Sequence, residues 1–414
     1  MTQTRGTDTG GRRLGAAGAA VMLATTLTNA LAYAVPVLGA RQLTAADLGA
    51  LATALALAAI AAVPGFGLQI AIAAHRARHG TTNTTRLALL TATFTTGLTA
   101  AAAPLLAPAL RLSLALTLLL AASTFATVLA GRWLGELQGD QRFLRLSGAM
   151  TVLAAGRYGG LVVGLLLNRG PVGCLLLGTL TGFLVLPLLA RIASPARATP
   201  LAHVLAGPVA ERPTSAGGPD RLLTGPQVMT ACAATLAMLV ISYADLLLAR
   251  QLLPATGSGG YAVGSVLTKG ALWAPQVVTL LVLPRLALGD RRARAVALGL
   301  ILACGAVLVA ASAVAGELAF RLVGGADYLH LAGEAPLFAA TGALYAVVFM
   351  LVNDRVATGA RWPSAPLWVA TAGLVAAALL VAPRTVEGVL SCALVTAALT
   401  AAVLSWLAFR PTRG

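Results

Sequence analysis

The sequence has few charged residues and few aromatic ones. Of its 414 residues, 10% are charged and 5% are aromatic, whereas 58% are apolar and the mean hydropathy is +0.86. A soluble domain carries about 25% charged residues, so this chain has too little polar surface to cover a globule of its size. Uncharged runs repeatedly exceed the roughly 18–20 residues that a membrane span needs. The composition excludes small secreted scaffolds and most cytosolic enzymes, and it predicts a polytopic membrane protein.

Cysteine and lysine are scarce as well. The four cysteines fall singly in four apolar segments, so neither a disulfide framework nor a zinc site is indicated. The sequence contains no Walker A, H-E-x-x-H or G-x-S-x-G motif, and we therefore expect neither an enzyme nor a bound cofactor. Lysine occurs once, at Lys269, against 28 arginines. The position of this single lysine is therefore informative.

The chain divides into twelve apolar segments when it is cut at charges and at Gly/Pro clusters. Each segment is long enough to form a membrane-spanning helix. The twelve predicted spans are residues 14–40, 48–74, 87–107, 114–131, 146–168, 171–190, 227–249, 260–284, 295–316, 335–352, 363–382 and 388–408.

The arginines orient these spans. If the N-terminus is cytoplasmic and the spans alternate in direction, the cytoplasmic segments hold 21 arginines and the outward loops hold six. Such an excess of positive charge is typical of cytoplasmic loops. We therefore expect a multi-pass protein of the cell membrane with both termini in the cytoplasm. The net charge of +16 reflects this topology, so no nucleic-acid partner is expected.

An internal repeat divides the spans six and six. The sequence Ala-Arg-Gln-Leu follows the first span at 40–43 and recurs after the seventh span at 249–252. Because each half has an even number of spans, the two copies have the same membrane orientation. This predicts an all-α fold of two six-helix lobes, in a parallel repeat, around a central cavity. The expected domains are an N-terminal lobe at 1–190, a cytoplasmic linker rich in proline and glycine at 191–226, and a C-terminal lobe at 227–414.

Three ionisable residues lie within the predicted spans, where each costs roughly 2.5–3.5 kcal/mol to insert. Arg157 is near the middle of the fifth span, Lys269 is in the eighth, and Asp245 is toward the outward end of the seventh. One cation from each lobe, facing a shared cavity, would suit a phosphate-bearing substrate. The alternative is that Lys269 and Asp245 form a structural pair. For Asp245 we favour the structural role.

Polar and small residues mark two further helix faces. Thr25, Asn29 and Tyr33 are spaced four residues apart in the first span, so they share one face of a helix. Such a stripe either lines a polar pathway or forms hydrogen bonds to another helix. In the fifth span, a ridge of glycines beside Arg157 is typical of close helix packing. Its members are Gly156, Gly160 and Gly164.

Short motifs recur in a characteristic order along both halves. They are the stretch 40–49 (Ala-Arg-Gln-Leu-Thr-Ala-Ala-Asp-Leu-Gly), the stretch 64–69 that ends in Gln69 and is followed by Arg76, the stretch 245–248 (Asp-Leu-Leu-Leu), and Gly260-Tyr261, Lys269 and Pro284-Arg285. Together they resemble the polysaccharide flippases of the multidrug/oligosaccharidyl-lipid/polysaccharide exporter superfamily.

The resemblance implies two six-helix bundles around a cavity with cationic side chains, which Arg157 and Lys269 fit by location and charge. It also implies translocation of an undecaprenyl-diphosphate-linked oligosaccharide by alternating access. The expected partners are this anionic lipid-linked substrate, membrane lipids, and a glycan polymerase or glycosyltransferases of the same pathway. We include Asn29, Tyr33 and Gln69 as further candidate substrate-binding residues, and Asp245, Arg41 and Arg250 as candidate structural or coupling residues.

Other activities remain as alternatives. A multidrug/cation antiporter of the same superfamily would be expected to carry acidic residues inside its N-terminal lobe, and the first six predicted spans contain none. Another twelve-span secondary transporter would fit the repeat, although the signature loops of major-facilitator carriers are not recognisable. A membrane-embedded glycan polymerase or ligase would need a large outward loop, and none exceeds about 20 residues.

We predict that a reporter fused after Gly414 reads cytoplasmic, because twelve spans return the chain to the side on which it starts. Paired fusions to a periplasm-active and a cytoplasm-active reporter measure this location. A signal from the outside would contradict the count of twelve spans.

Overall fold

A computed structural model describes residues 8–79, 83–194, 225–275, 291–358, 360 and 362–410. Within these residues the chain is almost entirely helical and contains no β-strand. Nine of the described helical segments are long and apolar enough to cross a membrane, and α15 (Ala365–Leu380) is apolar but shorter. The chain is therefore a multi-pass membrane protein, and the predicted all-α class is confirmed.

The N-terminal helices follow the first six predicted spans. They are α1 (Asp8–Gln42), α2 (Ala45–Ala61), α3 (Val63–His79), α4 (Thr85–Ala109), α5 (Leu114–Gly139), α6 (Phe143–Leu166), α7 (Gly170–Leu184) and α8 (Leu186–Ala193). The second and sixth spans are each divided into two helices. Pro64 and Pro187 lie in the first turns of α3 and α8, where the missing N–H of proline leaves no helical hydrogen bond unmade.

The C-terminal helices correspond to the remaining six spans. They are α10 (Gly225–Leu252), α11 (Ala255–Trp273), α13 (Arg291–Val323), the 3-10 helix η1 (Ala326–Glu334), α14 (Ala335–Ala357), α15 and α16 (Val386–Phe409). The end of the predicted eighth span, 276–284, and most of the predicted linker, 195–224, lie outside the described residues.

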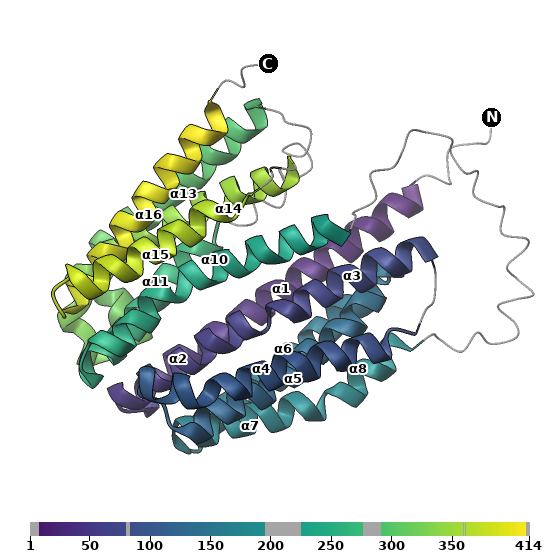
Figure 1. Cartoon of the computed structure of the whole chain (residues 1–414), viewed down its shortest axis with the longest axis horizontal. Coiled ribbons are helices and arrows are strands. Elements are labelled where there is room, and N and C mark those ends of the chain that lie inside the picture. The colour runs from purple at the N-terminus through teal and green to yellow at the C-terminus, as the bar shows by residue number, and fades with distance from the viewer. Residues whose placement is uncertain are drawn as a thin grey trace, which may run out of the picture.

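The helices gather into two groups, which we call the N-terminal bundle (α1–α8) and the C-terminal bundle (α10–α16). Within the first, α6 packs against α1 and α7, and α5 packs against α3 and α4; within the second, α14 packs against α11, α13 and α16. The bundles meet where α2 lies against α10 and α11. From there they diverge toward the end at which α1 begins and α16 ends (Figure 1).

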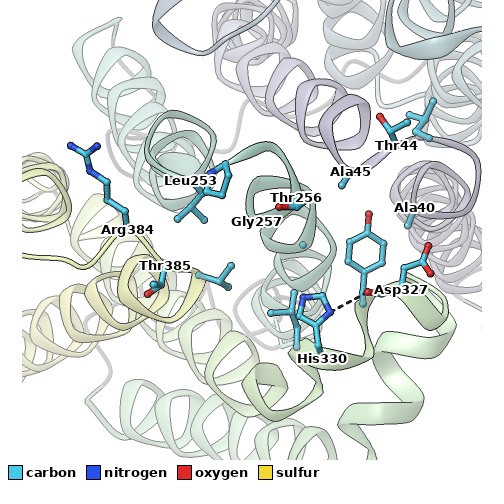
Figure 2. Close-up of a pocket in the computed structure, with 16 residues that line it drawn as sticks. Ala40, Thr44, Ala45, Leu253, Thr256, Gly257, Asp327, His330, Arg384 and Thr385 are labelled. Atoms are coloured by element: carbon cyan, nitrogen blue, oxygen red, sulfur yellow. Dashed lines mark hydrogen bonds between the residues drawn. The ribbon is translucent and has the colours of Figure 1, made fainter.

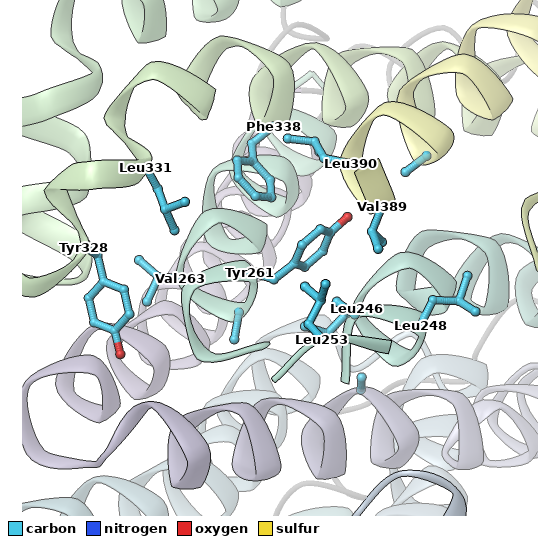
Figure 3. Packing of buried hydrophobic residues seen from close by; sticks show 14 of the residues in the cluster. Leu246, Leu248, Leu253, Tyr261, Val263, Tyr328, Leu331, Phe338, Val389 and Leu390 are labelled. Atoms are coloured by element: carbon cyan, nitrogen blue, oxygen red, sulfur yellow. The ribbon is translucent and has the colours of Figure 1, made fainter. Parts of the chain in front are cut away.

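The largest buried apolar cluster lies in the C-terminal bundle, near this meeting point. Tyr261 of α11 is fully buried, and its ring meets that of Phe338 edge-on at 5.3 Å between centroids. Leucine and valine side chains of α10, η1 and α16 surround the pair (Figure 3). Ala40, Leu48 and Ala56 from the N-terminal bundle complete the cluster. The two bundles therefore share apolar packing where they converge.

Ion pairs join helices within each bundle at the diverging end. Arg76 of α3 bonds Asp140 at 2.7 Å and lies 3.6 Å from Glu136, which also accepts from Arg132 at 3.0 Å. The first six predicted spans hold no acidic residue, but α5, which contains the fourth of them, extends to Gly139 and so includes Glu136. The helix α5 continues eight residues beyond the predicted end at 131, since its charges are paired inside the bundle. In the C-terminal bundle, Arg294 pairs with Asp354 at 2.9 Å.

The glycine ridge of α6 packs directly on α7, so the predicted close packing is confirmed. A Cβ atom at Gly160 would collide with the Thr181 side chain and the Leu177 carbonyl, and one at Gly164 would lie 2.6 Å from the Cα of Cys174. Small residues at these positions let the two helix backbones approach closely.

We predict that Gly160→Ala lowers the thermal unfolding temperature by several degrees, because overpacking an interface costs about 1–3 kcal/mol. Gly159→Ala is the matched control, since no atom lies within 4 Å of a Cβ atom added at Gly159. Unfolding of the purified protein in detergent, followed by tryptophan fluorescence, measures both variants. Equal unfolding temperatures for the two would contradict this account of the α6–α7 contact.

Candidate functional site

The single lysine of the chain lies on the face of α11 that meets α10. Its Nζ donates a hydrogen bond to the Ser242 carbonyl and lies 3.5 Å from the centre of the Tyr243 ring. A cation over an aromatic face is attracted by the ring quadrupole, and more strongly where water is excluded. The charge of Lys269 is therefore held beside Tyr243, a residue that the sequence analysis did not identify.

Arg157 approaches the same tyrosine from the other bundle. It lies in α6, half-buried, with its guanidinium carbon 5.4 Å from the centre of the Tyr158 ring. Tyr243 has both Tyr158 and Arg157 among its electrostatic neighbours. The two predicted cations, one from each bundle, therefore both interact electrostatically with Tyr243.

Tyr33 of α1 joins this group. Tyr243 is its electrostatic neighbour, and the Tyr33 hydroxyl is buried with no hydrogen-bond partner among the described residues. A buried hydroxyl without a partner is costly and is expected to find one when a polar ligand is present. Asn29, one turn earlier on α1, has an exposed side chain, and the side chain of Thr25 lies outside the described residues.

Asp245 is buried on α10, three residues after the Ser242 whose carbonyl accepts from Lys269, but it bonds other groups. Its Oδ2 accepts from the Tyr261 hydroxyl at 2.9 Å, and its Oδ1 accepts from the Leu246 N–H at 2.8 Å. Among the ion pairs of the described residues there is none between Asp245 and Lys269, although the two interact electrostatically. This arrangement leaves Lys269 without a carboxylate partner in the described part of the chain.

The sequence analysis identified only one of the tyrosines, Tyr33, as a candidate site residue. The chain has only six tyrosines, and five of them lie around these charges: Tyr33, Tyr158, Tyr243, Tyr261 and Tyr345. The signal that could have found them is their low number, together with their placement inside predicted spans. The contacts themselves join α1, α6, α10, α11 and α14, so no local pattern indicates them.

The remaining predicted residues lie elsewhere. Gln69 of α3 donates to Gln138 of α5 at 2.9 Å within the N-terminal bundle, so the structure does not bring it to Tyr243. Arg41 and Arg250 lie at the converging end and bond backbone carbonyls of the opposite bundle. These three residues are therefore separate from the Tyr243 cluster, by which we mean Tyr33, Arg157, Tyr158, Tyr243 and Lys269.

A pocket of about 480 Å³ opens at the converging end. Residues of the α1–α2 and α10–α11 turns, η1 and the start of α16 line it (Figure 2). Arg384 lies at its edge, and the His330 ring lies with its Nδ1 3.1 Å from the Asp327 carbonyl oxygen. None of the residues that we predicted for substrate binding lines this pocket.

No protein-family model and no curated protein matches the sequence. Solved structures do match it over nearly its whole length. The eukaryotic MATE transporter AtDTX14 has a TM-score of 0.62 and 12% identity, over 96% of this chain and 94% of that one. An inward-facing multidrug resistance MATE family transporter of the MOP superfamily has a TM-score of 0.62 and 16% identity, over 92% and 94%. The lipid II flippase MurJ, in an inward closed conformation, has a TM-score of 0.64 and 13% identity, over 94% and 87%.

This chain has the fold of these transporters. The predicted resemblance to this superfamily is thereby confirmed at the level of fold, as is the architecture of two helical bundles. The MATE-like fold carries both multidrug transporters and a lipid flippase. Because one fold can support several functions, the choice between substrates depends on the chemistry of the site.

We predict that Tyr261→Phe destabilises the protein by about 1–3 kcal/mol, because it leaves a buried carboxylate oxygen of Asp245 without its donor. Tyr345→Phe is the control, since the Tyr345 hydroxyl is buried and has no hydrogen-bond partner among the described residues. Denaturation in mild detergent compares the two. A Tyr261 variant as stable as the Tyr345 variant would show that the hydroxyl of Tyr261 does not support Asp245.

Proposed function

We propose that this chain is a flippase that moves an undecaprenyl-diphosphate-linked oligosaccharide across the cell membrane by alternating access. The observation that supports this function is the Tyr243 cluster, in which Arg157 and Lys269 come from different bundles and both interact electrostatically with one aromatic residue. Asp245, the nearest acid, is bonded to Tyr261 instead. The cluster is therefore net positive, which suits a diphosphate.

Each member of the cluster has a role that its chemistry allows. The guanidinium of Arg157 can form two parallel hydrogen bonds to phosphate oxygens, whereas the ammonium of Lys269 acts as a mobile point charge. The tyrosines offer hydroxyl donors and aromatic faces on which a sugar ring can pack. The Tyr33 hydroxyl, which has no partner among the described residues, is a donor available to the substrate.

Because the cluster includes residues of both bundles, binding of the substrate can be coupled to movement of the bundles. A ligand held by both Arg157 and Lys269 contacts both bundles at once, so it binds best in the conformation that places the two cations at the right separation. A ligand shifts a conformational equilibrium by its difference in affinity for the two states. In the proposed transporter the bundles are the lobes 1–190 and 227–414, joined by the linker 191–226, with both termini in the cytoplasm.

A multidrug/cation antiporter is the second candidate, because MATE transporters share the fold and Asp245 is a buried carboxylate. The N-terminal bundle offers this function little support. Its buried acid, Glu136, is bonded to Arg76 and Arg132 and also accepts from Thr84 at 2.8 Å. A coupling carboxylate must exchange a proton or an ion, and these bonds would oppose that exchange.

We predict that Arg157→Ala and Lys269→Ala each lower transport by about 30-fold, the ratio equivalent to losing about 2 kcal/mol of charge-assisted bonding. The measurement is the pool of undecaprenyl-diphosphate glycans, profiled by mass spectrometry in a deletion strain that carries each variant. Arg169→Ala is the matched control, because Arg169 is an exposed arginine at the start of α7. Immunoblots of the membrane fraction establish that all variants accumulate equally.

Three outcomes are informative. Accumulation of one lipid-linked oligosaccharide in the deletion strain, reversed by wild type and by Arg169→Ala only, supports the proposed function. A normal lipid pool in both cluster variants would remove Arg157 and Lys269 from the substrate site. An unchanged pool in the deletion strain, with altered drug sensitivity, would reject the flippase in favour of the antiporter.

A further inference from the structure

At the converging end, one arginine of the C-terminal bundle reaches into the N-terminal bundle. The guanidinium of Arg250, in the last turn of α10, donates to the carbonyl oxygens of Leu110 at 3.1 Å, Arg111 at 2.9 Å and Ala46 at 3.1 Å. It also donates to the Ser258 hydroxyl at 3.3 Å. With 8% of its surface exposed, Arg250 is buried between the two bundles.

Two arginines of the N-terminal bundle make the reverse connection. Arg111, which follows α4, donates to the Leu253 carbonyl at 3.1 Å. Arg41, in the last turn of α1, donates to the Leu322 carbonyl at 3.1 Å. Arginines therefore cross the boundary between the bundles in both directions. We refer to Arg41, Arg111 and Arg250 together as the arginine latch.

The latch follows the internal repeat. Arg41 and Arg250 occupy the same place in the repeated Ala-Arg-Gln-Leu sequence. Their acceptors correspond as well, because Arg250 bonds the end of α4 and Arg41 bonds the end of α13, the third span of each bundle. Each copy of the repeat thus reaches the equivalent helix end in the opposite bundle. Chance contacts would not be expected to reproduce this reciprocity.

Helix geometry explains why these carbonyls are available. The last carbonyl groups of a helix lack partners within the helix, and they carry the negative end of its dipole. The chain turns sharply after both acceptor helices, at Arg111 with φ of 50° and at Gly325 with φ of 84°. These turns end α4 and α13 and leave carbonyls for an arginine of the opposite bundle.

The contacts of the latch suit repeated opening. Within the described residues, the ion pairs involve none of the three latch arginines, and their recorded acceptors are carbonyl and hydroxyl oxygens. On separation, guanidinium and carbonyl groups at the ends of the helices can both be hydrated. The closed contact is nevertheless tight, since a Cβ atom at Gly49 would lie 2.9 Å from Ser258 Oγ and 3.1 Å from Arg250 Nη1.

The two halves of the latch are unequal. Arg250 has four acceptors and is buried, whereas Arg41 has one and is exposed. Arg321, the counterpart of Arg111 in the second bundle, is exposed and lies 3.6 Å from Glu317 of its own helix. The 480 Å³ pocket adjoins both halves, since its lining includes Ala40, next to Arg41, and Leu253, the acceptor of Arg111 (Figure 2).

We propose that Arg41, Arg111 and Arg250 form a reversible latch that holds the bundles together at this end, and that the latch opens first on the Arg41 side. By the arginine distribution this is the outward end. That the latch opens during transport rests on the proposed function. That the arginines hold the bundles together at this end rests on the hydrogen bonds alone and is independent of the proposed function.

The test is a distance measurement across the latch by pulsed electron paramagnetic resonance. Spin labels are attached to cysteines placed at Gln42 and Gln251, which are exposed and equivalent in the repeat, in a chain whose four native cysteines are replaced by alanine. The wild-type latch is expected to give mainly one short distance. Arg250→Ala is expected to raise the ratio of long to short distances about tenfold, as the net loss of one charge-assisted hydrogen bond implies.

Three further variants make the measurement decisive. Arg41→Ala is expected to give a smaller rise than Arg250→Ala, and Arg321→Ala, the matched control, none. Arg250→Lys keeps the charge but cannot reach several carbonyls at once, so its ratio of long to short distances is expected to be intermediate. It serves as the test if Arg250→Ala fails to fold.

Distances as in wild type for the Arg250 and Arg41 variants would overturn the latch. The lipid profile of the deletion strain tests the flippase function separately. If the distances change as expected but the lipid pool of the deletion strain is unchanged, the flippase function is rejected and the latch is retained.

Discussion

A charge inside a membrane needs a partner, because hydrocarbon cannot solvate it. The structure meets this constraint with a different kind of partner at each depth. Carboxylates neutralise arginines at the diverging end, as in Arg76 with Asp140 and Arg294 with Asp354. An aromatic ring and a backbone carbonyl hold Lys269 at intermediate depth. Carbonyls at helix ends accept from arginines at the converging end.

The kind of partner matches the mechanical role of each contact. Buried ion pairs are costly to break once formed, because separating them leaves an uncompensated charge. The ion pairs among the described residues lie within one bundle or the other: Arg76 ties α3 to α5, and Arg294 ties α13 to α14 and donates to the Ala408 carbonyl of α16 at 2.8 Å. Contacts between the bundles use neutral acceptors instead. Each bundle is thus stabilised as a unit, while the boundary between them remains separable.

Most of the fold follows from the sequence because the bilayer imposes a length and a composition on every span. Each of the twelve predicted segments overlaps at least one described helix; two are divided into two helices, residues 276–284 of the eighth lie outside the described part, and other differences lie at the ends. The prediction ended the fourth span at 131, before Arg132, whereas the helix continues to Gly139, because Arg132 and Arg76 pair with Glu136 inside the bundle. A cut at charged residues cannot anticipate a partner that comes from another helix. Gln69 was proposed from the resemblance alone, and its hydrogen bond to Gln138 joins α3 to α5, a contact that the sequence does not indicate.

The candidate site was accessible from the sequence only in part, for a physical reason. Arg157 and Lys269 stand out because a charge is rare in an apolar span, and their convergence on Tyr243 was not visible because Tyr243 carries no charge. The latch was harder still to identify, since its acceptors are backbone carbonyls, which every residue possesses. Only the donor arginines can be recognised in the sequence, because Arg41 and Arg250 recur in the repeated Ala-Arg-Gln-Leu sequence.

The choice of partner for Lys269 bears directly on how a phosphate could be bound. Had Lys269 formed an ion pair with Asp245, an incoming phosphate would have to displace a buried carboxylate, which costs about 3–5 kcal/mol when a partner is removed. Asp245 instead accepts from Tyr261 and from its own helix backbone, so each of its two oxygens already has a hydrogen bond. A cation on an aromatic face is held by only about 0.5–2 kcal/mol. By bonding Asp245, Tyr261 therefore leaves Lys269 without a carboxylate partner among the described residues, so that a phosphate would have to displace only the ring and the carbonyl.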